Sequence, residues 1–470
     1  MARSVCLHPD HRPAVKRSLE RNGFLTQGDL AAHLLIALST VNNFCRGIKV
    51  SVAKFEQICE SLNLDPHEMI LPQSAQAQES STPSPTSEPT AQFFAYDAFW
   101  VGRDLLTQTL LTKLADSCRL LLITGIAGVG KTALSERLAQ ALQATFKPVH
   151  FLRLNFDNQE QPTDFASAAA RLLEDCGQPV ATEARTHPQM LTRQLIAYLQ
   201  KTPCLILIDS LEHILQGNEQ TGWSDFKDPH FASFFGAILA TNSCQSRLIV
   251  TTQERPAQIV AAGSRYQNFW HCQPIGGLSE PEQAALFEKT GFTPAPELTR
   301  IGKAYEGHPL ALRTILGEIG DRPFFGNTAA YWNRYGHEIE AVEKSIAEAA
   351  AGHTTGADDK WQLDRFTRAL RWNVQQRLEH TFARLQQDAR DAYILLCETA
   401  VYRCPVPEDW WLSHLEDWDR EVAEQLAALD VLRDRYLVEE TTNDTDLLLK
   451  QHNLIRSVSL SHLNKLTYAS

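Results

Sequence analysis

The middle of the chain alternates short apolar runs with amphipathic stretches, which predicts strands that alternate with helices. Four apolar runs are interpreted as strands: residues 120–124, 149–154, 204–208 and 247–250. Amphipathic stretches before and between them are interpreted as helices: residues 105–117, 133–142, 165–174 and 190–200. Strands buried on both faces of a parallel sheet appear as continuous apolar runs. The pattern therefore predicts an α/β domain with a parallel sheet over residues 95–275.

At the N-terminal end, short bursts of helical periodicity predict a small all-helical module over residues 1–70. The expected helices are 11–21, 27–34, 39–46 and 55–62, with Thr26 as an N-cap and Gly47 as a C-terminal stop. Short helices joined by a tight turn are typical of a helix-turn-helix. Residues 71–94 are rich in Pro, Ser and Gln, so we expect a flexible linker and a module that is not packed rigidly on the rest.

Beyond residue 275 the spacing becomes helical again and predicts two further domains. The first is a helical domain over 276–385, with helices expected at 280–290, 297–305, 307–317, 339–351 and 363–384. The second covers 386–470, where helices at 389–401 and 421–433 precede a hairpin of strands 437–440 and 447–449. This order suits a winged helix. We expect Trp410, Trp411 and Trp418 to fill its core.

A glycine-rich segment, GIAGVGKT at residues 125–132, follows the first apolar run and fits the pattern G-x-x-x-x-G-K-[ST]. Such a loop presents backbone N–H groups to phosphates at the positive end of a helix dipole. Lys131 would reach the β- and γ-phosphates, and Thr132 would supply a hydroxyl to Mg²⁺. The residues expected to bind the nucleotide here are Gly125, Gly128, Gly130, Lys131, Thr132 and Ala133.

The ends of the next two strands carry the other candidate groups. Asp209 closes the run 204–208, where it would hold Mg²⁺ across from Thr132, or would merely cap the following turn. Glu212 is a candidate base for an attacking water. The threonines that end the strand at 247–250, among them Thr252, could sense a γ-phosphate or could be turn residues.

Composition excludes several classes of protein. The net charge of the 470 residues is −12, which argues against a protein that coats nucleic acid generally. The ten cysteines are scattered without a CxxC pair, which suits a reducing compartment. No apolar run approaches the roughly 20 residues that span a bilayer, and the N-terminus lacks a signal-peptide core. We therefore expect a cytoplasmic protein that makes no membrane contact.

Five motifs give these domains a family resemblance. VGRD at 101–104, the loop GIAGVGKT, LILIDS at 205–210, LIVTTQERP at 248–256 and GHPLAL at 307–312 follow one another along the chain. In order and spacing they resemble the NB-ARC family of STAND signal-transduction ATPases, over residues 95–465. That family includes plant disease-resistance proteins, the apoptosome scaffold and bacterial regulators. The resemblance implies an ADP/ATP-dependent conformational switch, with an ADP-bound resting state and an ATP-bound open or oligomeric state.

The resemblance also implies roles for residues outside the glycine-rich loop. Val101, Gly102 and Arg103 would line the adenine, and Pro309 would pack near the nucleotide or couple it to the next domain. His452, in QHNLIR at 451–456, would contact the β-phosphate of ADP and so hold the closed state. Asn453 replaces the aspartate that usually follows this histidine.

Two departures concern hydrolysis. Ser210 stands where many relatives have a second acid, and Gln253 where relatives often carry an arginine, although Arg255 is nearby. We therefore expect slow hydrolysis of ATP that serves a switch, with nucleotide binding intact.

The N-terminal module has a resemblance of its own. Residues 25–47, LTQGDLAAHLLIALSTVNNFCRG, resemble the repressor-type helix-turn-helix family, with Leu35 where a turn glycine is usual and Ala37 where a polar cap is usual. The resemblance implies that four polar residues face the major groove and two basic residues the phosphates: Ser39, Thr40, Asn42 and Asn43, with Arg46 and Lys49. Residues 1–70 carry eight basic and seven acidic side chains, a weak electrostatic footprint. DNA binding and protein binding both stay open.

Three functional hypotheses remain. The preferred one is a nucleotide-operated switch, which forms a homo-oligomer when active. Because no repeat array follows, we expect either a sensor or effector protein in trans or a minimal switch that acts through the N-terminal module. The second is a nucleotide-controlled transcriptional regulator that binds DNA through residues 1–70. The third is a constitutive ATPase in which Lys131, Thr132 and Asp209 are the working parts.

Overall fold

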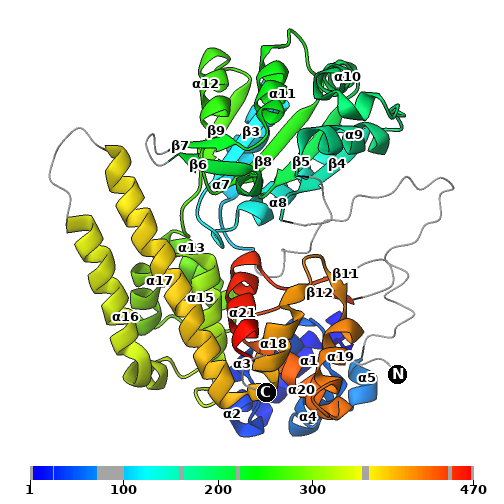
Figure 1. The fold of residues 1–470 in the computed structure, drawn as a ribbon. Helices are drawn as coiled ribbons and strands as arrows, with labels where there is room; N and C mark the ends of the chain where they lie inside the picture. The colour runs from blue at the N-terminus through cyan, green and yellow to red at the C-terminus, as the bar shows by residue number, and fades with distance from the viewer. Residues whose placement is uncertain are drawn as a thin grey trace. The chain divides into compact units, whose positions relative to one another are not determined.

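The computed structural model describes residues 4–24, 26–70, 100–157, 163–218, 223–351, 359–442 and 447–466. The chain divides into two compact units. Figure 1 shows the chain as a ribbon coloured from the N-terminus to the C-terminus. The sheet unit is Gly102–Gly277. The helical unit combines the N-terminal residues up to Ile70, Trp100 and Val101 with the chain from Leu278 onward. The predicted linker 71–94, the predicted loop at 352–358 and the hairpin turn at 443–446 lie outside the described residues.

The sheet unit is built on a five-stranded parallel sheet in the order β4-β5-β8-β3-β9. Its strands are β3 (Leu120–Thr124), β4 (His150–Asn155), β5 (Cys204–Asp209), β8 (Arg247–Thr252) and β9 (Trp270–Pro274). Every residue of the three central strands is buried, which explains why they appear as continuous apolar runs. The predicted parallel sheet of a multidomain α/β protein is confirmed. Strand β9 was not predicted, because WHCQP at this sheet edge is half-buried and lacks an apolar run.

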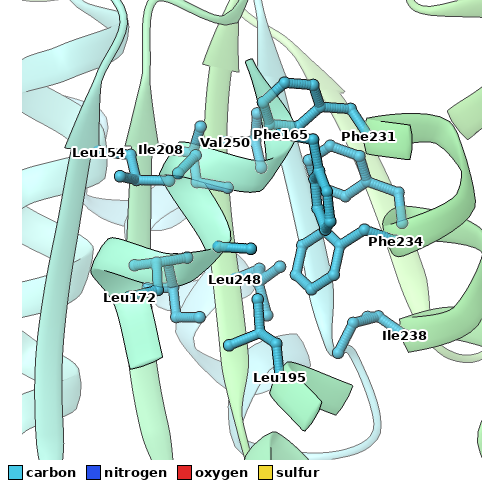
Figure 2. Packing of buried hydrophobic residues seen from close by; sticks show 14 of the residues in the cluster. Leu154, Phe165, Leu172, Leu195, Ile208, Phe231, Phe234, Ile238, Leu248 and Val250 are labelled. Atoms are coloured by element: carbon cyan, nitrogen blue, oxygen red, sulfur yellow. The ribbon is translucent and has the colours of Figure 1, made fainter. Parts of the chain in front are cut away.

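Helices cover both faces of this sheet, as expected for parallel strands joined by crossovers. They are α7 (Asp104–Ala115), α8 (Lys131–Phe146), α9 (Phe165–Asp175), α10 (Pro188–Lys201), α11 (Pro229–Ala240) and α12 (Ala257–Arg265), with short 3₁₀ turns η2 (Ala184–Thr186) and η3 (Leu211–Ile214). Figure 2 shows how aromatic rings from α9 and α11 pack over strand residues such as Leu248 and Val250. The rings of Phe165 and Phe231 meet edge to face with centroids 5.3 Å apart.

A two-stranded hairpin interrupts the alternation after β5. Strands β6 (Leu215–Asn218) and β7 (Trp223–Phe226) pair antiparallel. Phe226 anchors the hairpin, because its ring stacks on Phe231 and Phe235 at 5.9 and 5.7 Å. This hairpin was not predicted, since its polar residues carry no strand periodicity.

The N-terminal module of the helical unit contains the four predicted helices. Its elements are β1 (Ser4–Val5), η1 (Pro9–His11), α1 (Arg12–Arg21), α2 (Gln27–Leu34), α3 (Leu38–Arg46), β2 (Val50–Ser51), α4 (Val52–Ser61) and α5 (Pro66–Met69). Thr26 caps α2 in a reciprocal capping box with Asp29, as expected. Leu35 adopts a left-handed conformation with φ 56°, at the turn where the resemblance led us to expect glycine.

The middle of the helical unit is wholly helical among the described residues. It contains α13 (Glu280–Lys289), α14 (Pro296–Ala304), α15 (Pro309–Gly320), α16 (Thr328–Ala351) and α17 (Asp359–Asp388). Glu318 of α15 is buried between Arg377 and Arg384 of α17, so an ionic cluster ties these two helices together.

The C-terminal part combines helices with a three-stranded antiparallel sheet in the order β10-β12-β11. Its elements are α18 (Arg390–Glu398), η4 (Thr399–Val401), β10 (Val406–Pro407), α19 (Glu408–Glu416), α20 (Val422–Asp434), β11 (Glu439–Thr442), β12 (Leu447–Lys450) and α21 (Asn453–Leu466). The predicted strand pair is present. Trp411 is fully buried, but Trp410 is 55% exposed, so its expected place in the core is wrong.

The N-terminal module packs against other parts of the helical unit, which differs from the expectation that it is not packed rigidly on the rest. It belongs to the same compact unit as the chain from Leu278 onward, and α3 hydrogen-bonds to Asp434 of α20. Ser39, Thr40 and Asn42, expected to face a DNA groove, are buried, and Asn42 donates to the carbonyl oxygen of Lys289 at the end of α13. The linker composition gave no information on this, because the contact depends on side chains of the module itself.

The helices of the described residues include none that is both long and apolar enough to cross a bilayer.

Candidate functional site

The glycine-rich loop lies between the end of β3 and the start of α8, as its sequence predicts. Gly130 is the N-cap of α8 with φ 96°, a conformation that a side chain would strain. At Gly125 there is no room for a side chain, since a Cβ would lie 2.7 Å from the carbonyl oxygen of Ile275 and 2.9 Å from Cγ1 of Val129. These two glycines therefore allow the close backbone turn that a phosphate cradle requires.

Lys131 extends into this loop from the first position of α8. Its Nζ donates to the carbonyl oxygens of Gly125 and Ile126 at 3.0 and 3.1 Å. The side chain is only 8% exposed, so the ammonium is held inside the curve of the loop. Gly128, with φ 78°, and Ala133, on the first turn of α8, complete the expected segment.

Asp209 and Thr132 come together at the carboxyl edge of the sheet. Thr132 Oγ1 lies 3.1 and 3.2 Å from the two carboxylate oxygens of Asp209. Thr251, at the end of β8, also donates its hydroxyl to Asp209 and accepts the N–H of Ser210 at 3.1 Å. Asp209 is 4% exposed. The two threonine hydroxyls thus orient one buried carboxylate opposite the loop.

Glu212 lies on the turn η3 and is held by Gln253. The backbone N–H and the side-chain Nε2 of Gln253 donate to the two oxygens of Glu212 at 3.2 and 2.8 Å. Gln253, one of the two departures from the family pattern, is therefore hydrogen-bonded to the candidate base Glu212. Ser210 adopts a left-handed conformation with φ 60°, which turns the chain away after Asp209.

The other candidates on this edge have different surroundings. Thr252 is fully buried, and its hydroxyl donates to the carbonyl oxygen of Glu254 at 3.0 Å, as a turn residue does. Arg255 is exposed. His213 lies 3.2 Å from Asp157, and this hydrogen bond raises the pKa of the imidazole.

Gly102 and Arg103 begin the sheet unit, both with positive φ, 60° and 58°. The Arg103 guanidinium donates to the carbonyl oxygens of Val129 and Gly276 at 2.9 and 2.8 Å. It therefore fastens the glycine-rich loop to the segment after β9. The family resemblance implied that this arginine contacts adenine. Its contact with the loop was not predicted.

Three predicted residues belong to the helical unit instead: Val101, Pro309 and His452. Pro309 is the first residue of α15, which His308 caps by accepting the Ala311 N–H at 3.3 Å. His452 precedes α21 and accepts the N–H of Leu454 at Nδ1, at 3.2 Å. The structure thus groups the loop, Asp209, Glu212 and Thr252 in one unit, and these three residues in the other.

Sequence reasoning missed two contacts at this edge. The bond from Thr251 to Asp209 could have been inferred, because both residues end adjacent parallel strands. The pairing of Gln253 with Glu212 joins two loops and leaves no local signature.

A family model described as AAA domain matches residues 114–254. A relative in sequence, an uncharacterized WD repeat-containing protein of Nostoc sp., is 29% identical over 217 residues. That match covers 44% of this chain and 17% of the relative, so this chain spans less than a fifth of that protein. The parallel sheet, the loop geometry and the matched region together define the class: the chain contains a P-loop NTPase domain.

Solved structures with a similar fold are distant in sequence. A STAND protein with a tetratricopeptide repeat sensor from Pyrococcus horikoshii aligns with a TM-score of 0.43 and 15% identity, covering 80% of this chain and 44% of that one. AMPPCP-bound DnaA from Aquifex aeolicus gives 0.33 and 13%, covering 79% and 92%. The Aeropyrum pernix ORC2 protein in its ADPNP-ADP complexes gives 0.29 and 13%, covering 82% and 98%.

Proposed function

We propose that this chain is a nucleotide-operated conformational switch that binds ATP and ADP, with Mg²⁺, at the glycine-rich loop. The observation that carries the proposal is the position of Lys131, whose ammonium lies 3.0 and 3.1 Å from the loop carbonyls of Gly125 and Ile126. A cation held inside a curve of backbone amides at a helix N-terminus is suited to an oligophosphate.

The oxygen donors opposite the loop fit Mg²⁺. This cation prefers hydroxyl, carboxylate and phosphate oxygens. The Thr132 hydroxyl and the Asp209 carboxylate lie 3.1 Å apart and supply two of these kinds. When bound, Mg²⁺ would neutralise phosphate charge, while Thr251 keeps the carboxylate oriented.

We propose slow hydrolysis rather than constitutive turnover. Asp209 is followed by Ser210 and not by a second carboxylate. Glu212 is the nearest alternative base in the sequence, and both of its oxygens accept hydrogen bonds from Gln253. A base that already accepts two hydrogen bonds is less able to take a proton from water.

The switch itself is proposed to depend on His452. Its Nδ1 accepts a backbone N–H, so the neutral ring carries its proton on Nε2, which can donate to a phosphate oxygen. In the resting state ADP would be bound by the glycine-rich loop and by His452, and exchange for ATP would favour the open or oligomeric state. A nucleotide shifts such an equilibrium only by its different affinity for the two states.

The first test is the nucleotide that the protein carries. Acid extracts of freshly purified protein should contain close to one ADP per chain, and a fluorescent ADP should bind more tightly with Mg²⁺ than with a chelator. Protein that holds no nucleotide and fails to bind ADP or ATP would refute the proposal.

A further inference from the structure

Helix α3 of the N-terminal module is covered by other parts of the helical unit. Ser39, Thr40 and Asn42 keep only 3%, 3% and 4% of their surface exposed. Polar side chains on a short helix are seldom buried unless partners of matching chemistry cover them. We call the contact of α3 and Lys54 with the residues that cover them the α3 seam.

On one side of the α3 seam, the covering groups are carboxylates of α20. The hydroxyls of Ser39 and Thr40 both donate to Oδ1 of Asp434, at 2.8 and 2.7 Å. Lys54 Nζ lies 3.1 Å from Asp434 and 3.4 Å from Asp430. Burial alone would lower the pKa of Lys54, but these two carboxylates outweigh it and the pKa is raised, so the lysine stays charged.

On the other side, the acceptor is a backbone carbonyl at the end of α13. Asn42 Nδ2 and Arg46 Nη1 donate to the carbonyl oxygen of Lys289, at 3.1 and 2.9 Å. All five of these polar groups of the module are therefore donors, and all of their covering groups are acceptors. A polyanion offers the same acceptors.

Charge is complementary across the α3 seam. On the module side, the residues that line the seam are Thr40, Asn43, Lys49, Val50, Ser51 and Lys54. The opposite wall consists of Asp430, Arg433, Asp434, Glu440 and Leu447. The module side therefore carries two lysines and no carboxylate. The opposite wall carries three carboxylates and one guanidinium. The whole module has almost no net charge, but this face of it is cationic.

We propose that the α3 seam is an autoinhibitory contact in which Asp430 and Asp434 occupy the places of backbone phosphates of a DNA duplex. Hydroxyl, ammonium, amide and guanidinium donors that bind carboxylates also bind phosphate oxygens. The nine-residue helix α3 is preceded by α2 and a tight turn, and a helix of this size enters a major groove. The same donors cannot serve both partners, so duplex binding requires the seam to open.

The test compares carboxamide variants of the full chain. In Asp430→Asn/Asp434→Asn the acceptors lose their charge and keep their shape, so α3 should be released. The control Glu416→Gln/Asp417→Asn changes the charge equally at exposed positions on and beside α19. Hydrogen exchange of residues 38–46 measures release, and fluorescence anisotropy measures binding of a mixed-sequence duplex at about 50 and about 200 mM salt.

We expect faster exchange in α3 and duplex binding at least about tenfold tighter than in the parent and the control, with a steep salt dependence. Adding Lys54→Ala to the open variant should weaken the binding again. Ser39→Ala/Thr40→Ala opens the seam from the module side, and provides the exchange measurement if the first variant does not fold.

Two results would overturn the proposal. Unchanged exchange in α3 would mean that the carboxylates do not hold it. Faster exchange without tighter duplex binding would mean that the face accepts another partner, which an acidic peptide probe would then reveal. The proposal uses no residue of the nucleotide site, so its failure would leave the switch untouched.

Discussion

Two threonine side chains, one from a helix and one from a strand, share one carboxylate at the carboxyl edge of the parallel sheet. Thr132 and Thr251 both contact Asp209, which is almost completely buried. A buried carboxylate needs such donors, because leaving it unpaired would cost several kcal/mol, on the order of 3–5. The two hydroxyls therefore keep Asp209 oriented toward the glycine-rich loop without a second acid beside it.

At the scale of single residues, the position of Lys131 predicts how a substitution there changes nucleotide affinity. Lys131→Ala removes the cation held at the loop carbonyls of Gly125 and Ile126. Binding of fluorescent ADP should weaken at least about 100-fold, or about 2.7 kcal/mol, because a charge-assisted contact in a largely dry site is lost. Lys113→Ala, on the exposed side of α7, should bind like the parent. Equal affinity in all three proteins would contradict the assignment.

Glu212 and Gln253 make a second, kinetic prediction. If Glu212 is the base, Glu212→Gln should lower steady-state phosphate release about 100-fold or more. Gln253→Ala removes the 2.8 Å side-chain bond to Glu212 and should raise the rate. Glu183→Gln, an exposed carboxylate of the same unit, is the matched control. A parent-like rate in Glu212→Gln would assign the proton transfer to another group.

The site could be predicted from the sequence where its chemistry is local. Lys131 and Thr132 follow from a contiguous motif, and Asp209 from the strand that it ends. The Gln253–Glu212 pairing and the Arg103 contact with Val129 join loops that the sequence cannot place side by side.

At the scale of elements, an ionic cluster fastens α15 to α17. Glu318 is fully enclosed and contacts Arg377 and Arg384, while Thr381 donates to it at 2.6 Å. Burial by itself would raise the pKa of Glu318, but the two guanidinium groups outweigh it and lower the pKa to about 2. A carboxyl whose pKa falls on folding contributes stability above its ordinary pKa of 4.5 and loses it as the pH approaches 2.

Glu318→Gln should therefore destabilise the helical unit by about 3 kcal/mol at neutral pH, because the buried guanidinium groups of Arg377 and Arg384 lose one of their two counter-charges and keep only Glu338. The free energy of unfolding, measured in urea, should differ less between the variant and the parent as the pH falls from 4.5 toward 2. Glu343, which is partly exposed and pairs with Arg300, is the control, and Glu343→Gln should change stability little. A pH-independent difference would show that the charge of Glu318 is not the cause.

Elements with strong periodicity were predictable, and those stabilised by distant partners were not. Helix α2 and its cap at Thr26 matched the prediction, because the capping box is local. Strand β9 and the hairpin of β6 and β7 were missed, since they depend on pairing with β3 and on the anchor Phe226. Their own residues are too polar to indicate a strand.

At the scale of the whole molecule, the sequence indicated five consecutive parts, whereas the structure groups the chain into two units. The difference arises from contacts such as Ser39 with Asp434, which lie 395 residues apart. A composition that predicts a linker does not indicate whether the module on its N-terminal side packs against the rest of the chain. The N-terminal module and the C-terminal helices therefore form one unit in spite of the long separation.

His452 carries the last prediction, which concerns the nucleotide dependence of molecular shape. If its Nε2 donates to the β-phosphate of ADP, that hydrogen bond to a charged group contributes about 1.5–3 kcal/mol to the closed state. His452→Ala should then lower the ratio of closed to open molecules about 10- to 100-fold. A closed state populated at 99:1 would fall to between roughly 10:1 and 1:1, since each factor acts directly on the ratio.

Small-angle X-ray scattering with ADP and with a non-hydrolysable ATP analogue measures this ratio. The parent should have a smaller radius of gyration with ADP than with the analogue, and His452→Ala should lose most of that difference. His337→Ala, on the exposed side of α16, should keep it. Binding of ADP must be confirmed for each variant, because a variant that no longer binds ADP would lose the nucleotide-dependent change whatever His452 contributes to the closed state. If His452→Ala binds ADP and keeps the nucleotide-dependent change, residues other than this histidine must stabilise the closed state.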